Sequence, residues 1–198
     1  MRRSGSDACA RVGAMALNSV TVQVGLPFGL GSIQGEWTPD ELERDAAWDM
    51  YVEMITRVTV VELRANEGLL REALASFYSL FETTRRILKD GGPSLAGGEE
   101  GRVNFAHIAI SILNSAVRPL LATWHPQLED HEAKRPPATS RLEWESQWEH
   151  NDELRSAIGE VRDTLSSYAG LLGHVCGAHS LLSLTKPGET NNPSSTNE

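Results

Sequence analysis

The spacing of apolar residues predicts four long helices, because these residues recur every three or four positions, as they do on one helical face. The most regular pattern lies in the C-terminal third and consists of Leu154, Ile158, Val161, Leu165, Tyr168, Leu172 and Val175. A period of about 3.5 residues is typical of helices that pack at shallow angles in bundles. Because Ser140 and Glu143 have the spacing of a capping box, we expect this helix over about 140–176.

Two further helices are predicted in the first half of the chain, over about 38–62 and 66–90. The stretch TPDE, which begins at Thr38, is typical of a helix start capped by that threonine. The first helix is expected to bury Leu42, to keep Tyr51 at the margin of the core and to carry an acidic outer face. The second repeats apolar residues at helical spacing and ends in a glycine-rich loop.

The third helix is predicted over 104–133 and contains two prolines. Its apolar stripe consists of Ile110, Leu113, Val117, Leu121, Trp124 and Leu128. Pro119 and Pro126 each fall midway between two members of the stripe, so both lie on the side away from the core. Each removes one backbone hydrogen bond, which predicts a kinked helix that curves around the core.

The fold class predicted from these patterns is all-α, an up-and-down bundle of four main helices. Residues 1–37 are expected to form a flexible segment with a short strand at Val20–Val24, followed by turn residues only. Residues 38–182 form the predicted bundle domain. The polar composition of residues 183–198 predicts a disordered tail.

Composition and charge narrow the function classes. The chain of 198 residues is 40% hydrophobic, enough for a core without a metal or disulfide staple. Its net charge of −9 disfavours nucleic-acid and membrane partners, which require concentrated basic surface. Cys9 and Cys176 lie at opposite ends of the chain, so no disulfide framework is predicted. No secretory signal is recognised, and a cytoplasmic location is expected.

A polar stripe flanks the apolar stripe of the third helix and includes His107, Asn114, Arg118, His125 and Glu129. Two interpretations remain open for it. It is either the solvated flank of an amphipathic helix, which we prefer, or a polar network that lines a groove. No Glu-x-x-His or His-x-x-x-His pair occurs in the chain, and one His with one Glu supplies only two ligands. We therefore predict no metal and no cofactor.

An arginine–histidine motif supports an alternative function. Helical-bundle ribonucleases of the HEPN class resemble this chain in size and helix content and carry Arg-x(4–6)-His. The stretches RVNFAH (102–107) and RPLLATWH (118–125) both match, although chance alone produces about as many matches in this composition. The resemblance implies a metal-independent ribonuclease that uses Arg118 and His125, with Asn114 on the same helical face.

Aromatic and acidic residues gather around the connection between the third and fourth helices. They are Trp124, Trp144, Trp148, Glu145 and Glu149. Aromatic anchors with a polar rim are typical of a surface that binds a protein partner. In the other interpretation, which we hold equally, the indoles close one end of the core and donate their N–H groups to backbone carbonyls.

Three stretches carry a resemblance to other proteins. AAWDMYVEMITRV, EGLLREALASFYSLFETTRRIL and LNSAVRPLLATWHPQLEDHE are similar to uncharacterised helical proteins of actinobacteria, over about 36–182. The resemblance implies a bacterial cytoplasmic protein and supplies no site residues. The preferred function is a non-enzymatic interaction or regulatory module that binds a protein partner through its tryptophan-containing end. Homodimer formation stays open.

Overall fold

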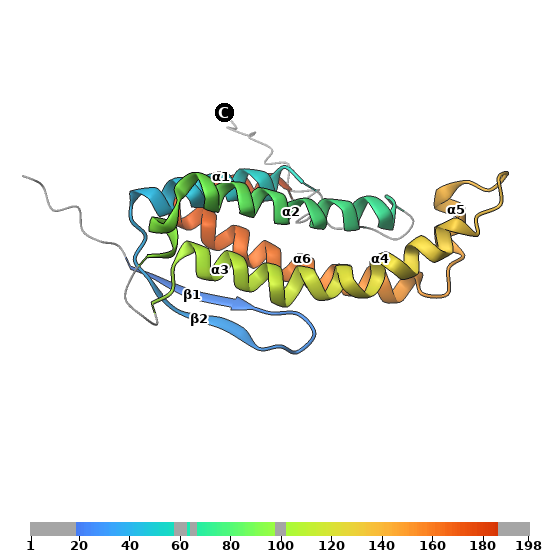
Figure 1. The fold of residues 1–198 in the computed structure, drawn as a ribbon, viewed down its shortest axis with the longest axis horizontal. Helices are drawn as coiled ribbons and strands as arrows, with labels where there is room; N and C mark the ends of the chain where they lie inside the picture. Colours follow the sequence, from blue (N-terminus) through green and yellow to red (C-terminus); the bar gives the residue numbers. More distant parts are fainter. Residues whose placement is uncertain (1–18, 58–62, 64–66, 98–101, 186–198) are drawn as a thin grey trace, which may run out of the picture.

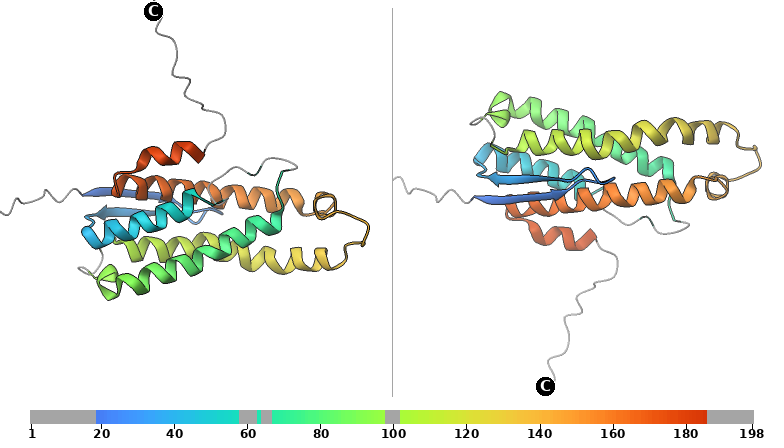
Figure 2. Two further views of the ribbon diagram at one scale, coloured as in Figure 1. Left: turned by 90° about the horizontal axis from the view of Figure 1, so that it is seen from above. Right: turned by 90° about the horizontal axis from the view of Figure 1, so that it is seen from below.

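The computed structural model describes residues 19–57, 63, 67–97 and 102–185. These residues are mostly α-helical, which confirms the mostly helical character predicted for the chain. The predicted loose ends largely lie outside these residues. The elements in chain order are β1 (Val20–Gly25), β2 (Ser32–Trp37), α1 (Glu41–Ile55), α2 (Leu70–Gly91), the 3-10 turn η2 (Pro93–Ala96), α3 (Phe105–Ile112), the π turn η3 (Leu113–Val117), α4 (Arg118–Ala133), α5 (Arg141–Ser146), α6 (Asn151–Val175) and the 3-10 helix η4 (His179–Thr185). The long helices α1, α2, α3–α4 and α6 lie side by side (Figures 1 and 2).

Residues 20–37, where only one strand is predicted, form an antiparallel hairpin. β1 and β2 pair so that Val20 lies opposite Trp37. The second strand was not predicted because its sequence contains Gly35, and glycine is depleted in strands. This strand forms because it pairs with β1 and buries Ile33 and Trp37. The hairpin lies against α6 (Figure 1), and its buried side chains belong to the main core.

Helix α1 begins later than predicted and buries a different face. Its cap is Asp40 rather than Thr38, and the Asp40 side chain accepts from the Glu43 backbone N–H (2.8 Å) in a reciprocal capping box. Tyr51 is fully buried, and its hydroxyl donates to a backbone carbonyl just beyond α6. Leu42 instead stays 37% exposed. The face is selected by α6 and α2, which pack against α1 from two sides.

Helix α6 carries the centre of the core. All seven residues of the predicted pattern are between 0% and 4% exposed, which confirms the pattern. The single helix predicted over 140–176 is nevertheless two helices, because α5 ends at Ser146 and α6 begins at Asn151. The Asn151 amide, which interrupts the apolar pattern, is buried and donates to the Glu145 carbonyl (2.7 Å). The polar residue at this position therefore stabilises the turn between α5 and α6.

The predicted third helix is continuous from Phe105 to Ala133 and contains the π turn η3. In this turn the Arg118 N–H donates to the Leu113 carbonyl, five residues back. The irregularity directly precedes Pro119, which has no N–H to continue the α-helical ladder. By length and composition this helix could cross a membrane. A buried core helix passes the same test, and 56% of the most apolar window is buried, so the property alone is weak evidence for a span.

Candidate binding groove

A groove of about 730 Å³ runs between α2 and the continuous helix α3–α4. Its apolar lining comes from both helices and includes Tyr78, Phe81, Leu88, Ile110, Leu113 and Leu121. Tyr78 and Ile110 are 64% and 45% exposed, which places them among the large hydrophobic side chains that the fold leaves uncovered. Exposed apolar side chains around a groove are typical of a binding site.

The groove continues past Ile110 into a second hollow of about 410 Å³. This hollow shares Leu88 and Ile110 with the first and is also lined by Pro93 of η2. From Ala106 to His125 the combined lining spans about 28 Å along the helix, at 1.5 Å per residue. Together the two hollows have the length of a helix of roughly 18–20 residues.

The groove is positively charged, although the chain as a whole carries −9. Arg85 and Arg118 line the first hollow and Lys89 lines the second, and neither lining includes an Asp or a Glu. The Arg118 guanidinium lies 5.2 Å from the centre of the Phe81 ring and donates to Asn114 Oδ1 (3.0 Å). Within the described part of the chain, no carboxylate pairs with any of these three cations.

The residues of the ribonuclease alternative lie on this groove. Asn114, Arg118 and His125 all line it. His107, which belongs to the same polar stripe, is exposed near the start of α3 and does not line the groove. The structure therefore supports the groove-lining interpretation for the central part of the stripe and the solvated interpretation for His107.

His125 lies at one end of the groove as a neutral ring. The Arg71 guanidinium donates to Nδ1 (3.0 Å), and because arginine has no acceptor, the ring proton is on Nε2. Burial and, second, the charge of Arg71 lower the pKa of His125. Its Nε2 is buried and has no hydrogen-bond partner among the described residues. The ring thus holds an unsatisfied donor beside the groove.

The tryptophan end of the protein is packed mostly inside the fold. Trp148 is 8% exposed and meets Trp124 edge to face, with ring centroids 6.1 Å apart. Trp144 is half-buried, stacks on His131 at 4.7 Å and donates its indole N–H to the His131 carbonyl (2.8 Å). These contacts favour the second interpretation of the sequence, in which the indoles close one end of the core.

The two acidic residues predicted at this end have different environments. Glu145 is 2% exposed, and its carboxylate accepts from the backbone N–H groups of Leu70 (2.8 Å) and Arg71 (3.5 Å). Because α2 has no side-chain cap of its own, Glu145 takes that role. Burial raises the pKa of Glu145, and the two N–H donors oppose that rise. The Glu149 side chain is 84% exposed and lies 3.6 Å from the His150 ring.

Neither a metal site nor a similarity to known proteins indicates the function. Among the described residues, no three His, Cys, Asp or Glu side chains come together as they would around a metal ion. Comparison with protein-family models, with curated proteins and with solved structures finds no match. The resemblance to actinobacterial helical proteins stays a prediction, and the function has to be inferred from the groove itself.

Proposed function

We propose that this protein is a non-enzymatic helical interaction module whose groove binds an amphipathic helix with acidic flanks, supplied by a protein partner. The observation that supports this proposal is the combination of an apolar lining with three cations that pair with no described carboxylate, in a chain of net charge −9. In this proposal the scaffold is an up-and-down bundle whose four main helices are α1, α2, α3–α4 and α6.

A helix suits this groove because both of its walls are helices. An amphipathic helix laid between them presents apolar side chains at three-and-four spacing to the apolar lining. Its acidic flanks lie beside Arg85, Lys89 and Arg118, and charge pairs at such a rim speed association and set orientation. The length of the groove accommodates about five helical turns. Burial of the exposed Tyr78 and Ile110 side chains supplies the hydrophobic part of the binding energy.

We favour the groove over the tryptophan end as the partner-binding surface. Trp148 is buried against Trp124, and Glu145 is buried and hydrogen-bonded to the start of α2, so neither is free to contact a partner. Of the other residues predicted there, Trp124 and Trp144 are half-buried and Glu149 is exposed. The hollow at this end, about 250 Å³, is lined mostly by charged side chains and is smaller than the groove.

The test is fluorescence anisotropy with a designed, labelled helix of roughly 18 residues that has leucines at three-and-four spacing and glutamates on both flanks. We expect binding that weakens with salt. The double variant Arg85→Glu/Arg118→Glu should raise Kd by more than about tenfold, because it opposes like charges across the interface. A control peptide with lysines in place of the glutamates should bind weakly to the wild type and more tightly to the variant.

A matched protein control is Glu82→Arg/Asp130→Arg, which alters exposed acidic residues of α2 and α4 that do not line the groove. It should bind the acidic peptide like the wild type. Equal affinity of the wild type for acidic and basic peptides would show that the groove has no charge preference and would remove the support for this proposal.

One observation favours a second candidate function, a metal-independent ribonuclease. Asn114, Arg118 and His125 share one groove, and a neutral histidine can accept a proton as a general base. Against this stands the Arg71 contact, which occupies the acceptor nitrogen of the His125 ring. A base would have to release that contact before it could act.

The ribonuclease is tested with a fluorogenic single-stranded RNA in the presence of EDTA. Cleavage by the wild type that is lost in His125→Ala and in Arg118→Ala would establish it. His107→Ala is the matched control, because His107 ends the other Arg-x(4–6)-His stretch and lies outside the groove. Absence of cleavage by the purified wild type, or equal cleavage by all four proteins, would reject the candidate.

A further inference from the structure

The outer face of α1 carries side chains that the fold leaves free. Leu42 and Trp48 are 37% and 41% exposed, and Glu41, Asp45 and Asp49 are exposed beside them. At about 100° of rotation per residue, these five side chains fall within an arc of about 120°. We call this arc the acidic face. Asp45 and Trp48 also border a hollow of about 380 Å³ beside the C-terminal end of α6, whereas the buried residues of α1 pack against α6 and α2.

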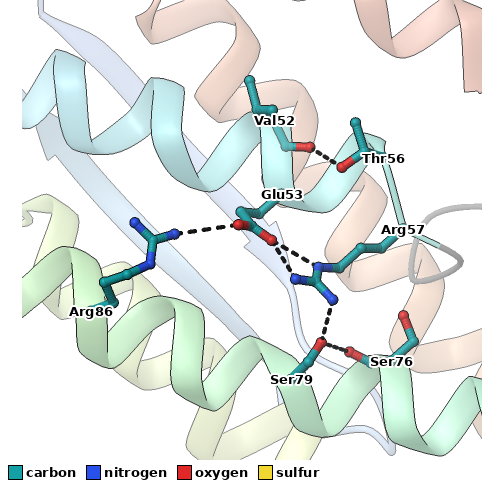
Figure 3. A network of polar contacts seen from close by, with 7 residues as sticks. All are labelled: Val52, Glu53, Thr56, Arg57, Ser76, Ser79 and Arg86. Carbon is teal, nitrogen blue, oxygen red and sulfur yellow. Dashed lines mark hydrogen bonds and ion pairs between the residues drawn. The ribbon is translucent and has the colours of Figure 1, made fainter.

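The carboxylates of the acidic face differ from that of Glu53, which lies on the same helix. Glu53 binds two arginines, one of which, Arg57, also donates to Ser79 of α2 (2.9 Å; Figure 3). This network ties α1 to α2 and neutralises Glu53. Asp45 and Asp49 have neither an ion pair nor a side-chain hydrogen bond with any residue that the structure describes. Their charges are therefore available to a partner.

The acidic face has the properties that the groove requires of its occupant. It is helical, and its two exposed apolar side chains are flanked by carboxylates, whereas the groove has two exposed apolar side chains flanked by cations that pair with no described carboxylate. The 15 residues of α1 span about 22 Å, which fits within the groove length of about 28 Å. Charge, exposed apolar side chains and length thus match between two surfaces of the same chain.

We infer that the groove binds a second copy of this chain, through the acidic face of that copy. The inference rests on the proposed function and names its partner. Because the groove and the acidic face are different surfaces, the contact is heterologous, and a head-to-tail dimer keeps one free groove and one free acidic face. Copies therefore add head to tail as the protein concentration rises, and salt shortens the chains because it screens the charge pairs.

The test is analytical ultracentrifugation of the full chain from micromolar to millimolar concentration, where the wild type should gain mass with concentration. The face variant is Leu42→Ser/Trp48→Ser and the groove variant is Tyr78→Ser/Ile110→Ser. All four side chains are exposed, so both variants should fold, and each alone should be monomeric. Mixed together they should form a dimer that grows no further, because only one intact groove and one intact acidic face can meet.

A charge reversal tests the same contact without changing its apolar residues. Asp45→Arg/Asp49→Arg and Arg85→Glu/Arg118→Glu should each be monomeric, and a mixture of the two should assemble again because the signs are complementary. Glu82→Arg/Asp130→Arg, the control for both designs, should assemble like the wild type.

Three outcomes decide the inference. A wild type that stays monomeric at every concentration overturns it, and binding of the designed acidic peptide by that same monomer would leave the proposed function standing. Assembly that the serine variants do not weaken also overturns it, because the copies then meet through other surfaces. A groove that binds neither the peptide nor a second copy overturns the inference and the proposed function together.

Discussion

The tryptophan end and the groove contain the same kinds of residue, but the fold uses them in opposite ways. At the tryptophan end, the Trp144 indole N–H and the Glu145 carboxylate are bonded to backbone groups, and Trp148 is buried. In the groove, aromatic and charged side chains are exposed, and Arg85 and Arg118 have no carboxylate partner among the described residues. Exposure and pairing, rather than residue type, therefore separate a structural cluster from a candidate binding surface.

Arg71 joins the two regions. Its backbone N–H donates to the Glu145 carboxylate, and its guanidinium contacts both Glu132 (2.7 Å) and the His125 ring. Substitutions at the tryptophan end should therefore affect stability more than binding in the groove. Substitutions on the groove rim should affect binding more than stability. The predictions below test this difference, beginning with the largest expected effect.

Trp148→Ala should lower the free energy of unfolding by about 3–5 kcal/mol, because it removes a buried aromatic side chain and leaves a cavity beside Trp124. Chemical denaturation followed by circular dichroism measures the change. A loss of less than about 1 kcal/mol would mean that the indole contributes little to the core, and the tryptophan end would regain its place as a binding surface.

Glu145→Ala should lower the free energy of unfolding by about 1–3 kcal/mol, because it leaves the Leu70 N–H buried without an acceptor. Glu145→Gln should lower it less, because the amide oxygen can still accept that hydrogen bond. The same denaturation experiment compares the two variants. If alanine and glutamine were equivalent, the cap of α2 would not be the role of this side chain.

His125 should make stability depend on pH below about 6.5. Its pKa is lowered in the folded state, so at mildly acidic pH the unfolded chain binds a proton that the folded chain excludes. The contribution of the neutral His125 ring to stability is fully present above the pKa of histidine in the unfolded chain. It is lost as the pH falls through the lower pKa of His125 in the folded protein. Denaturation at pH 7.5 and at pH 5.5 should show a larger loss for the wild type than for His125→Gln. Equal losses would contradict the buried, neutral ring.

Tyr78→Ser and Ile110→Ser should change the free energy of unfolding by about 0.5 kcal/mol or less each, because both side chains are largely exposed. The same variants should weaken binding of the designed acidic helix. Stability and anisotropy measured on one preparation compare the two effects directly. A variant that unfolds easily would place its side chain in the core, and the contrast with Trp148 would disappear.

The sequence by itself determined the elements whose signal is local. The apolar residues from Leu154 to Val175 alternate spacings of four and three positions, which predicted one buried helical face. Every residue of this pattern is buried. Helical spacing also placed Asn114, Arg118 and His125 on one side of a helix, where the structure finds them in one groove. These outcomes were predictable because helical geometry relates near neighbours in the chain without reference to the rest of the protein.

Only the tertiary structure decided what depends on distant partners. Glu145 caps a helix that begins 75 positions earlier, and β2 exists because β1 lies beside it. The packing of α6 and α2 against α1 buried Tyr51 and left Leu42 outside, against the prediction. The groove itself needs α2 and α3–α4 at a particular separation. No local pattern encodes these features, because burial and pairing are set by contacts between segments that are far apart in sequence.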